Sequence, residues 1–171
     1  MHIELSSKRL NFRKITSDDY KSICKILQDR DIMYAWEHAF SNEEVRDWIK
    51  ENLTRYENEG FSYFAVIEKD TKNFIGLMGP LIENINGQKY IGIAYILDKN
   101  YWGCGYAAEG AKACMDYAFN VLGADKVIAQ IRPENVSSRK VAQKIGMKIE
   151  SEYTKIYRDK KMRHLIYSRT K

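Results

Sequence analysis

The chain has little of what a membrane, secreted or metal-binding protein needs. None of its apolar runs approaches the eighteen or so residues of a membrane-spanning helix, and residues 1–9 lack the apolar core of a signal peptide. The three cysteines, Cys24, Cys104 and Cys114, are odd in number and have no metal-ligand spacing. These absences predict a protein of the reducing cytoplasm, with no membrane contact and no metal.

Length and composition predict one domain over residues 1–171. Hydrophobic residues make up 44% of the chain and charged residues 30%, which is typical of a globular protein. A chain of 171 residues suits one hydrophobic core, and neither a repeat nor a linker divides it.

Positive charge gathers in the C-terminal third. Residues 132–171 hold 12 Lys/Arg against 4 Asp/Glu, a net charge of +8, whereas residues 1–131 hold 16 against 19, a net charge of −3. A basic segment suits an anionic cofactor or a nucleic acid. Basic runs with interleaved aromatics and recognisable nucleic-acid modules are missing, so a nucleic-acid-binding domain is the weaker alternative.

Hydrophobic periodicity predicts the element order βααβββαβαββ. Strands are expected over residues 8–15, 61–67, 74–82, 90–97, 126–131, 147–157 and 162–168, and helices over residues 20–27, 41–60, 106–122 and 136–145. Ser41 with Glu44 forms a capping box, and Asn86 with Gly87 is a type I′ turn signal. The predicted fold class is therefore α/β, and more narrowly α+β. It has one mixed sheet with helices on both faces.

A loop with two glycines joins the strand 90–97 to the helix that begins at Tyr106. Glycines let the backbone turn with its amides inward, and the first amides of a helix have no intrahelical partner. The helix dipole adds partial positive charge, so a pyrophosphate is stabilised there. Taken alone, the loop also fits a plain tight turn. The third glycine of a dinucleotide fold and the Gly-Lys-Ser/Thr of a P-loop are both missing.

Two motifs resemble the GNAT N-acetyltransferase superfamily, in particular its RimJ/RimL-like branch of ribosomal-protein N-terminal acetyltransferases. The family's loop, Arg/Gln-x-x-Gly-x-Gly/Ala, is similar to residues 100–105, and the branch's Tyr-Trp-Gly-x-Gly-Tyr-Ala-x-Glu is matched by residues 101–109. The motif Pro-x-Asn-x-x-Ser, with a helix ending Lys-x-Gly-Phe, lies on residues 133–138 and on residues 144–147, which end in Met147. The resemblance implies a GNAT-like mixed, mostly antiparallel sheet of about seven strands flanked by four helices.

The resemblance also implies acetyl-CoA as co-substrate and assigns residues to it. Main-chain groups near Ile96 and Leu97 would pair with the pantetheine where neighbouring strands splay apart, and the loop amides would hold the pyrophosphate. The implied cofactor-binding residues are Ile96, Leu97, Asn100, Trp102, Gly103, Cys104, Gly105, Tyr106, Ala107, Asn135 and Ser138. Arg139 and Lys140 are expected near the nucleotide phosphates.

The sequence departs from the family where catalysis is concerned. Gly92 stands where many relatives have a glutamate base, and Ala142 where many have a tyrosine that protonates the thiolate. Ser138 is therefore the expected hydroxyl near the thiol. Glu37 and His38 are candidate bases, because they lie in the aromatic segment expected at the acceptor site and histidine has an ordinary pKa of about 6.5. Both also fit an ordinary surface role.

The predicted function is transfer of an acetyl group from acetyl-CoA to a primary amine by direct attack in a ternary complex. The branch points to a protein N-terminal α-amine, and other relatives point to small-molecule amines. In either case Tyr34, Trp36 and Phe40 are candidates for the wall of the acceptor pocket, and they fit packing in the core at least as well. Gly92 and Ala142 leave a non-catalytic acetyl-CoA-binding sensor as the alternative, and the chain fits a monomer or a homodimer equally.

Overall fold

The computed structural model describes residues 4–171, which form one seven-stranded sheet in the order β1-β2-β3-β4-β5-β7-β6. The strands are β1 Leu10–Lys14, β2 Phe64–Glu68, β3 Phe74–Ile85, β4 Gln88–Leu97, β5 Lys126–Ile131, β6 Lys148–Tyr157 and β7 Lys160–Thr170. Neighbouring strands are antiparallel except β4 and β5, which are parallel.

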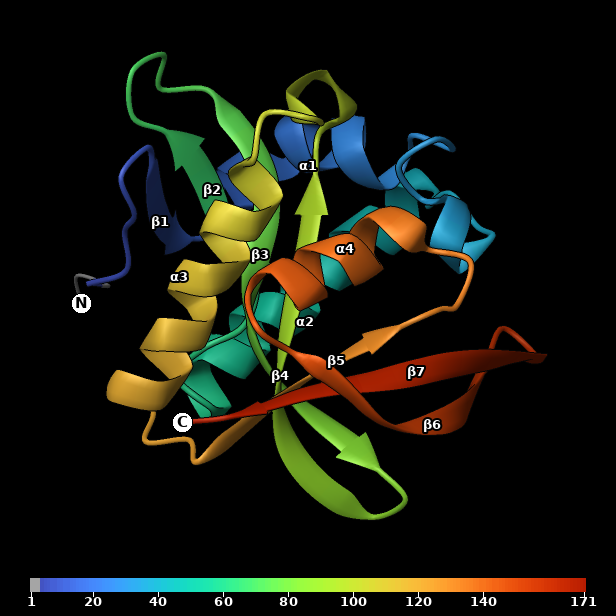
Figure 1. Ribbon diagram of the computed structural model, residues 1–171. Coiled ribbons are helices and arrows are strands. Elements are labelled where there is room, and N and C mark those ends of the chain that lie inside the picture. The colour runs from blue at the N-terminus through green and yellow to red at the C-terminus, as the bar shows by residue number, and fades with distance from the viewer. Residues whose placement is uncertain (1–3) are drawn as a thin grey trace.

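Four helices cover the two faces of the sheet. They are α1 Tyr20–Leu27, α2 Asn42–Asn58, α3 Tyr106–Asn120 and α4 Val136–Lys144, and short 3-10 turns lie at η1 Ser17–Asp19, η2 Tyr34–Trp36 and η3 Lys99–Tyr101. Figure 1 shows α3 and α4 on one face and α1 and α2 on the other. The predicted element order and fold class are confirmed. Within residues 4–171, no helix has the length and apolar character needed to cross a bilayer.

Local sequence signals account for the ends of several elements. Ser41 and Glu44 form the predicted capping box at the start of α2. Asn86 and Gly87 both have positive φ, 51° and 81°, as a type I′ turn requires. The strand expected from residue 61 begins only at Phe64, because residues 61–63 pack and hydrogen-bond outside the sheet; the Tyr63 carbonyl, for example, accepts a hydrogen bond from the Tyr56 hydroxyl.

A close approach between α3 and the sheet sets the position of the loop before α3. A Cβ atom added at Gly110 would lie 2.3 Å from the Sδ atom of Met78 on β3, so a larger residue here would require the Met78 side chain to move. Buried small residues of α3, among them Ala111 and Ala118, continue the same face. The N-terminus of α3 is thereby held close to the end of β4.

The strands β4 and β5 separate soon after they pair. Only Ile91 with Val127 and Gly92 with Ile128 are in register, whereas β3 stays paired with β4 as far as Leu97. Figure 1 shows β4 continuing toward α1 while β5 turns away from it. Residues 93–97 of β4 therefore have an edge that no neighbouring strand covers, as the resemblance led us to expect.

Candidate active site

Two cavities meet at the uncovered edge of β4. The first, the loop cavity, has a volume of about 570 Å³ and is bounded by the loop after β4, the start of α3 and one side of α4. The second, the aromatic cavity, has a volume of about 180 Å³ and lies among β3, β4, β5, β6 and β7. They share the wall residues Trp36, Tyr95, Ile96, Asn135 and Ser138. Molecules bound in the two cavities would therefore lie on neighbouring sites, with these five residues in common.

The loop cavity ends in a backbone cradle. Gly103 and Gly105 have φ angles of 75° and 81°, in the left-handed region that favours glycine. Among the residues that the structure describes, no acceptor pairs with the backbone amides of residues 103–108. These amides and the positive end of the α3 dipole suit a bound phosphate group.

Arg9 on the segment before β1 holds this cradle in place. Its Nη1 donates to the Cys104 carbonyl over 3.0 Å, and its guanidinium carbon lies 4.1 Å from the centre of the Tyr106 ring. Its Nε donates over 2.7 Å to Glu109, which also accepts hydrogen bonds from the Arg9 amide and the Ser7 hydroxyl. Glu109 therefore braces the loop and does not face either cavity.

Most of the implied cofactor-binding residues line the loop cavity. These are Ile96, Leu97, Trp102, Gly103, Gly105, Tyr106, Ala107, Asn135 and Ser138. Asn100 and Cys104 do not, because the Asn100 amide donates to Asp98 and the Cys104 side chain is exposed. Arg139 is also turned away, since it donates to the Tyr167 hydroxyl and the Pro133 carbonyl. The positively charged side chains that line the loop cavity are those of Lys140 and Lys144.

Asn135 and Ser138 lie together at the start of α4, on the wall that both cavities share. The Asn135 Oδ1 atom accepts from the Ser138 amide over 3.2 Å and from the Tyr34 hydroxyl over 2.6 Å, which leaves its Nδ2 atom to donate to a ligand. The Tyr95 hydroxyl donates to the Ser138 carbonyl over 2.8 Å, and burial raises the Tyr95 pKa, so this hydroxyl keeps its proton. The Ser138 hydroxyl itself has no hydrogen-bond partner among the described residues.

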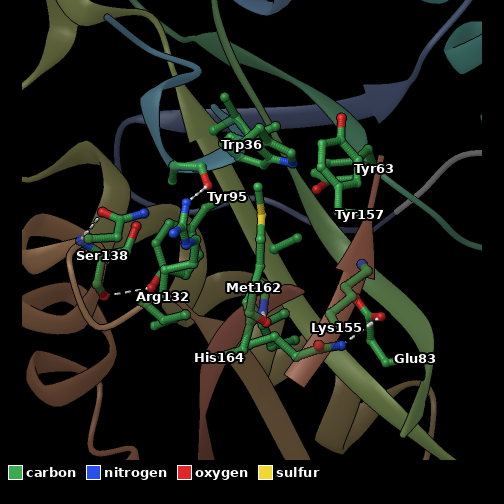
Figure 2. A pocket seen from close by; sticks show the side chains of 17 residues that line it. Trp36, Tyr63, Glu83, Tyr95, Arg132, Ser138, Lys155, Tyr157, Met162 and His164 are labelled. Carbon is green, nitrogen blue, oxygen red and sulfur yellow. Dashed lines mark hydrogen bonds between the residues drawn. The ribbon is translucent and has the colours of Figure 1, made fainter. Parts of the chain in front are cut away.

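The aromatic cavity combines ring faces with a few ionisable side chains, as Figure 2 shows. Its walls include Trp36, Tyr63, Tyr95, Tyr157 and Met162, and its ionisable groups other than tyrosine are Glu83, Arg132, Lys155 and His164. Burial lowers the pKa of His164, so that this imidazole is neutral at pH 7. The cavity therefore presents polar and apolar surface in about equal measure.

Glu83 is a functional candidate that the sequence patterns did not reveal. Its side chain lies on β3 diagonally across from Gly92, and a Cβ atom added at Gly92 would be 2.5 Å from the Glu83 Cγ atom. Glu83 therefore occupies the space beside the position of the missing family glutamate. The type I′ turn at residues 86–87 could have located it, because that turn fixes which residues of β3 and β4 are neighbours.

The two predicted bases in the segment between α1 and α2 line neither cavity. The Glu37 carboxylate lies 3.5 Å from Arg132 and 3.4 Å from Lys160, and the His38 Nε2 atom lies 2.8 Å from Glu44. The Glu37 pairs hold the segment against the end of β5 and the start of β7, and the His38 pair holds it against the start of α2. The catalytic roles of Glu37 and His38 stay predictions that this geometry does not favour.

Two of the three aromatic residues predicted at the acceptor site line a cavity, and the third does not. Trp36 lines both cavities and Tyr34 lines the loop cavity, whereas Phe40 packs against the core and lines neither. Ala142 is fully buried, so its side chain reaches neither cavity.

No group of three or more histidine, cysteine, aspartate or glutamate side chains suited to a metal ion occurs within residues 4–171.

Several basic side chains of residues 132–171 pair with acidic ones elsewhere. Arg158 contacts Glu44 over 2.6 Å, and Arg132 and Lys160 both approach Glu37. Arg163 pairs with Glu152 within the same segment. These pairs neutralise part of the positive charge that the sequence suggested for nucleic acid.

Comparisons with known proteins agree with this site. Residues 9–148 match the protein family described as "Acetyltransferase (GNAT) domain". The N-acetyltransferase YnaD of Bacillus subtilis, itself uncharacterized, is 30% identical over 161 residues, which cover 91% of this chain and 87% of YnaD. The GNAT-family acetyltransferase from Bacillus anthracis superposes with a TM-score of 0.82 over 97% of both chains, at 25% identity.

The ribosomal-protein branch appears among the structural neighbours. RimL, the ribosomal L7/L12 alpha-N-protein acetyltransferase in complex with coenzyme A, superposes with a TM-score of 0.77 over 96% of this chain and 95% of its own, at 17% identity. At that identity the likeness shows a common fold. From the family match, the relatives and the arrangement of the two cavities, we conclude that this chain belongs to the GNAT N-acetyltransferase family, whose members use acetyl-CoA.

Proposed function

We propose that this protein transfers the acetyl group of acetyl-CoA to a primary amine held in the aromatic cavity. The proposal is carried by the meeting of the two cavities at the uncovered edge of β4. Transfer without a covalent enzyme intermediate requires donor and acceptor to lie side by side. The shared wall provides that contact.

The loop cavity fits acetyl-CoA in charge and in hydrogen bonding. The unpaired amides of residues 103–108 and the start of α3 suit a pyrophosphate, and Lys140 and Lys144 add positive charge nearby. The edge of β4 over residues 93–97 and the Asn135 Nδ2 atom suit the amide groups of a pantetheine arm. When bound there, acetyl-CoA supplies an activated acyl group as a thioester.

Ser138 is the proposed proton donor to the sulfur. Its hydroxyl lies on the shared wall, and the bonds from its amide to Asn135 and from Tyr95 to its carbonyl fix the first turn of α4. Positioned proton transfer typically contributes 10²–10⁴-fold to a rate. Much of the remaining acceleration comes from holding the two reactants together.

The acceptor is a primary amine of either class that the sequence suggested. A small-molecule amine would enter the aromatic cavity whole, whereas a protein would insert its N-terminal residue. The structural neighbour RimL, a ribosomal L7/L12 alpha-N-protein acetyltransferase, supports the second class. The ring faces of Trp36, Tyr63 and Tyr157 suit the apolar part of either acceptor.

Calorimetric titration with acetyl-CoA tests the first half of the proposal. Gly105→Glu places a carboxylate in the phosphate cradle and should abolish binding. Gly123→Glu is the matched control, because Gly123 also has positive φ but lies at the other end of α3 with open space around it. If the folded wild type does not bind acetyl-CoA, the proposal is wrong.

Release of free thiol tests the second half. We would supply acetyl-CoA with amino acids, polyamines, aromatic amines and short peptides with free N-termini. Turnover of one amine class would support the proposal and name the acceptor. Tight binding of acetyl-CoA without turnover of any amine would instead support the non-catalytic sensor.

A further inference from the structure

Two neighbouring side chains of the aromatic cavity have no role in the function proposed so far. Glu83 on β3 and Gln130 on β5 both line the cavity, and the Gln130 Nε2 atom donates to the Glu83 Oε2 atom over 3.0 Å. This bond fixes which way the Gln130 amide points. Its Oε1 atom is then a buried acceptor without a partner in the described part of the chain.

An unpaired buried acceptor beside a carboxylate suits a ligand that donates several hydrogen bonds. Leaving a buried polar atom unpaired costs about 1–3 kcal/mol, so a ligand that pairs with it gains binding energy. An ammonium group has three donors and a positive charge, which match the Gln130 Oε1 atom and the Glu83 carboxylate together. The ring faces of Trp36 and Tyr63 add a surface that attracts cations.

We infer that Glu83 and Gln130 bind the ammonium group of the acceptor and that Glu83 then takes its proton, directly or through one water molecule. This inference rests on the proposed function and names the base that function lacks. The proton passes to the Glu83 carboxylate, and the lone pair it leaves on nitrogen forms the new bond to the acetyl carbon. The carbon–sulfur bond breaks, with its electron pair going to sulfur. The Ser138 hydroxyl gives its proton to that sulfur and regains the second proton that the nitrogen loses as the amide forms.

The surroundings of Glu83 suit a base. Burial raises its pKa above the usual value, which makes the carboxylate a better proton acceptor. Lys155 on β6 and Arg55 on α2 act in the opposite direction and limit this rise in the pKa. The other titratable groups that line the cavity are Arg132, the neutral His164, and three tyrosines whose pKa values are raised by burial, Tyr63, Tyr95 and Tyr157.

Glu83→Gln tests the inference through the pH dependence of kcat. In the wild type, kcat should level off above the pKa of Glu83. In Glu83→Gln, only acceptor that is already neutral can react, so kcat should fall by about 10²–10⁴-fold at pH 7 and then rise tenfold per pH unit toward the pKa of the amine. Glu152→Gln on β6 removes a carboxylate that lines neither cavity and should leave the profile unchanged.

Carbon-13 NMR of glutamate carboxyl groups gives a readout that does not need turnover. One glutamate should titrate above the usual range, its signal should be missing in Glu83→Gln, and it should shift when the acceptor amine is added without acetyl-CoA. Gln130→Leu should weaken that binding while leaving acetyl-CoA binding unchanged.

The outcomes separate the two proposals. If Glu83→Gln keeps the wild-type kcat and pH profile, or if the Glu83 signal does not respond to the amine, the inference is overturned and the acetyltransferase proposal stands. If the wild type binds acetyl-CoA but acetylates no primary amine, the proposed function fails, and the role of Glu83 fails with it.

Discussion

Gly92 has no side chain, and the side chain of Glu83 fills the space beside it. Gly92→Ala should therefore push Glu83 out of position, because the new Cβ atom would lie 2.5 Å from its Cγ atom. We expect kcat to fall at least tenfold and the stability to fall by about 1–3 kcal/mol from overpacking. Acetyl-CoA affinity should not change, because Gly92 lies outside the loop cavity. Steady-state kinetics, thermal melting and calorimetry on one preparation would check all three, and an unchanged kcat would count against Glu83.

Residues differ in how far the sequence could predict their roles. The sequence placed Gly103, Gly105 and Ala107 at the loop cavity, because a phosphate cradle depends on consecutive backbone groups, which a local motif records. It did not place Glu83 in the aromatic cavity, because that position depends on the register between two strands. Glu37 was a candidate base because it lies in the aromatic segment expected at the acceptor site. Its side chain turns instead toward Arg132 and Lys160. Side-chain direction in a segment without periodicity does not follow from sequence.

The capping box of α2 makes part of the stability depend on pH. The Ser41 amide and His38 lower the pKa of Glu44 to about 2, from a usual value of 4.5. The folded state therefore gains stability from ionised Glu44 above pH 4.5 and loses it as the pH falls toward 2. Glu44→Gln should cost at most about 1 kcal/mol at pH 7, because water screens this partly exposed group. The difference from wild type in thermal melting should shrink between pH 5 and pH 2.

Glu43→Gln is the matched control for this measurement. Glu43 also lies in the first turn of α2, but it is exposed and accepts no hydrogen bond from the described residues. Its effect should be small and nearly independent of pH in the same range. Equal pH dependence of the two variants would show that the capping box is not the cause.

The segment before β1 should influence acetyl-CoA binding through the loop before α3. Arg9→Ala removes the hydrogen bond to the Cys104 carbonyl and the stacking on Tyr106. We expect acetyl-CoA affinity to fall several-fold in calorimetry, because the loop must then be ordered at the cost of binding energy. Arg13→Ala on β1 loses the bidentate pair with Asp19 instead, and should lower stability without changing affinity.

The molecule as a whole is a sheet of two parts that share little pairing. Strands β1 to β4 form one part, strands β5 to β7 form the other, and two residue pairs join them. Acetyl-CoA bound along β4 and against α4 would contact both parts. At 100 times its Kd it should stabilise the fold by about 2.7 kcal/mol, and hydrogen exchange should slow in β5 as well as in residues 93–97. Gly105→Glu should show neither change when acetyl-CoA is added.

Whole-molecule properties followed from the sequence to different degrees. Element order and the mixed sheet were predictable because periodicity and turn residues are local signals, and Lys126–Ile131 was placed without error. The ion pairs of the basic C-terminal residues could not be predicted from the sequence. Arg158 and Glu44, for example, are distant in the chain and meet only after folding.

The diagonal placement of Glu83 and Gly92 has a consequence for how such enzymes are compared. Neighbouring positions on one face of a sheet can exchange a chemical group with no change in the path of the backbone. An alignment assigns each group to a column, so it would score this chain as having lost its base. A superposition that asks only where a carboxylate lies would find one still in place.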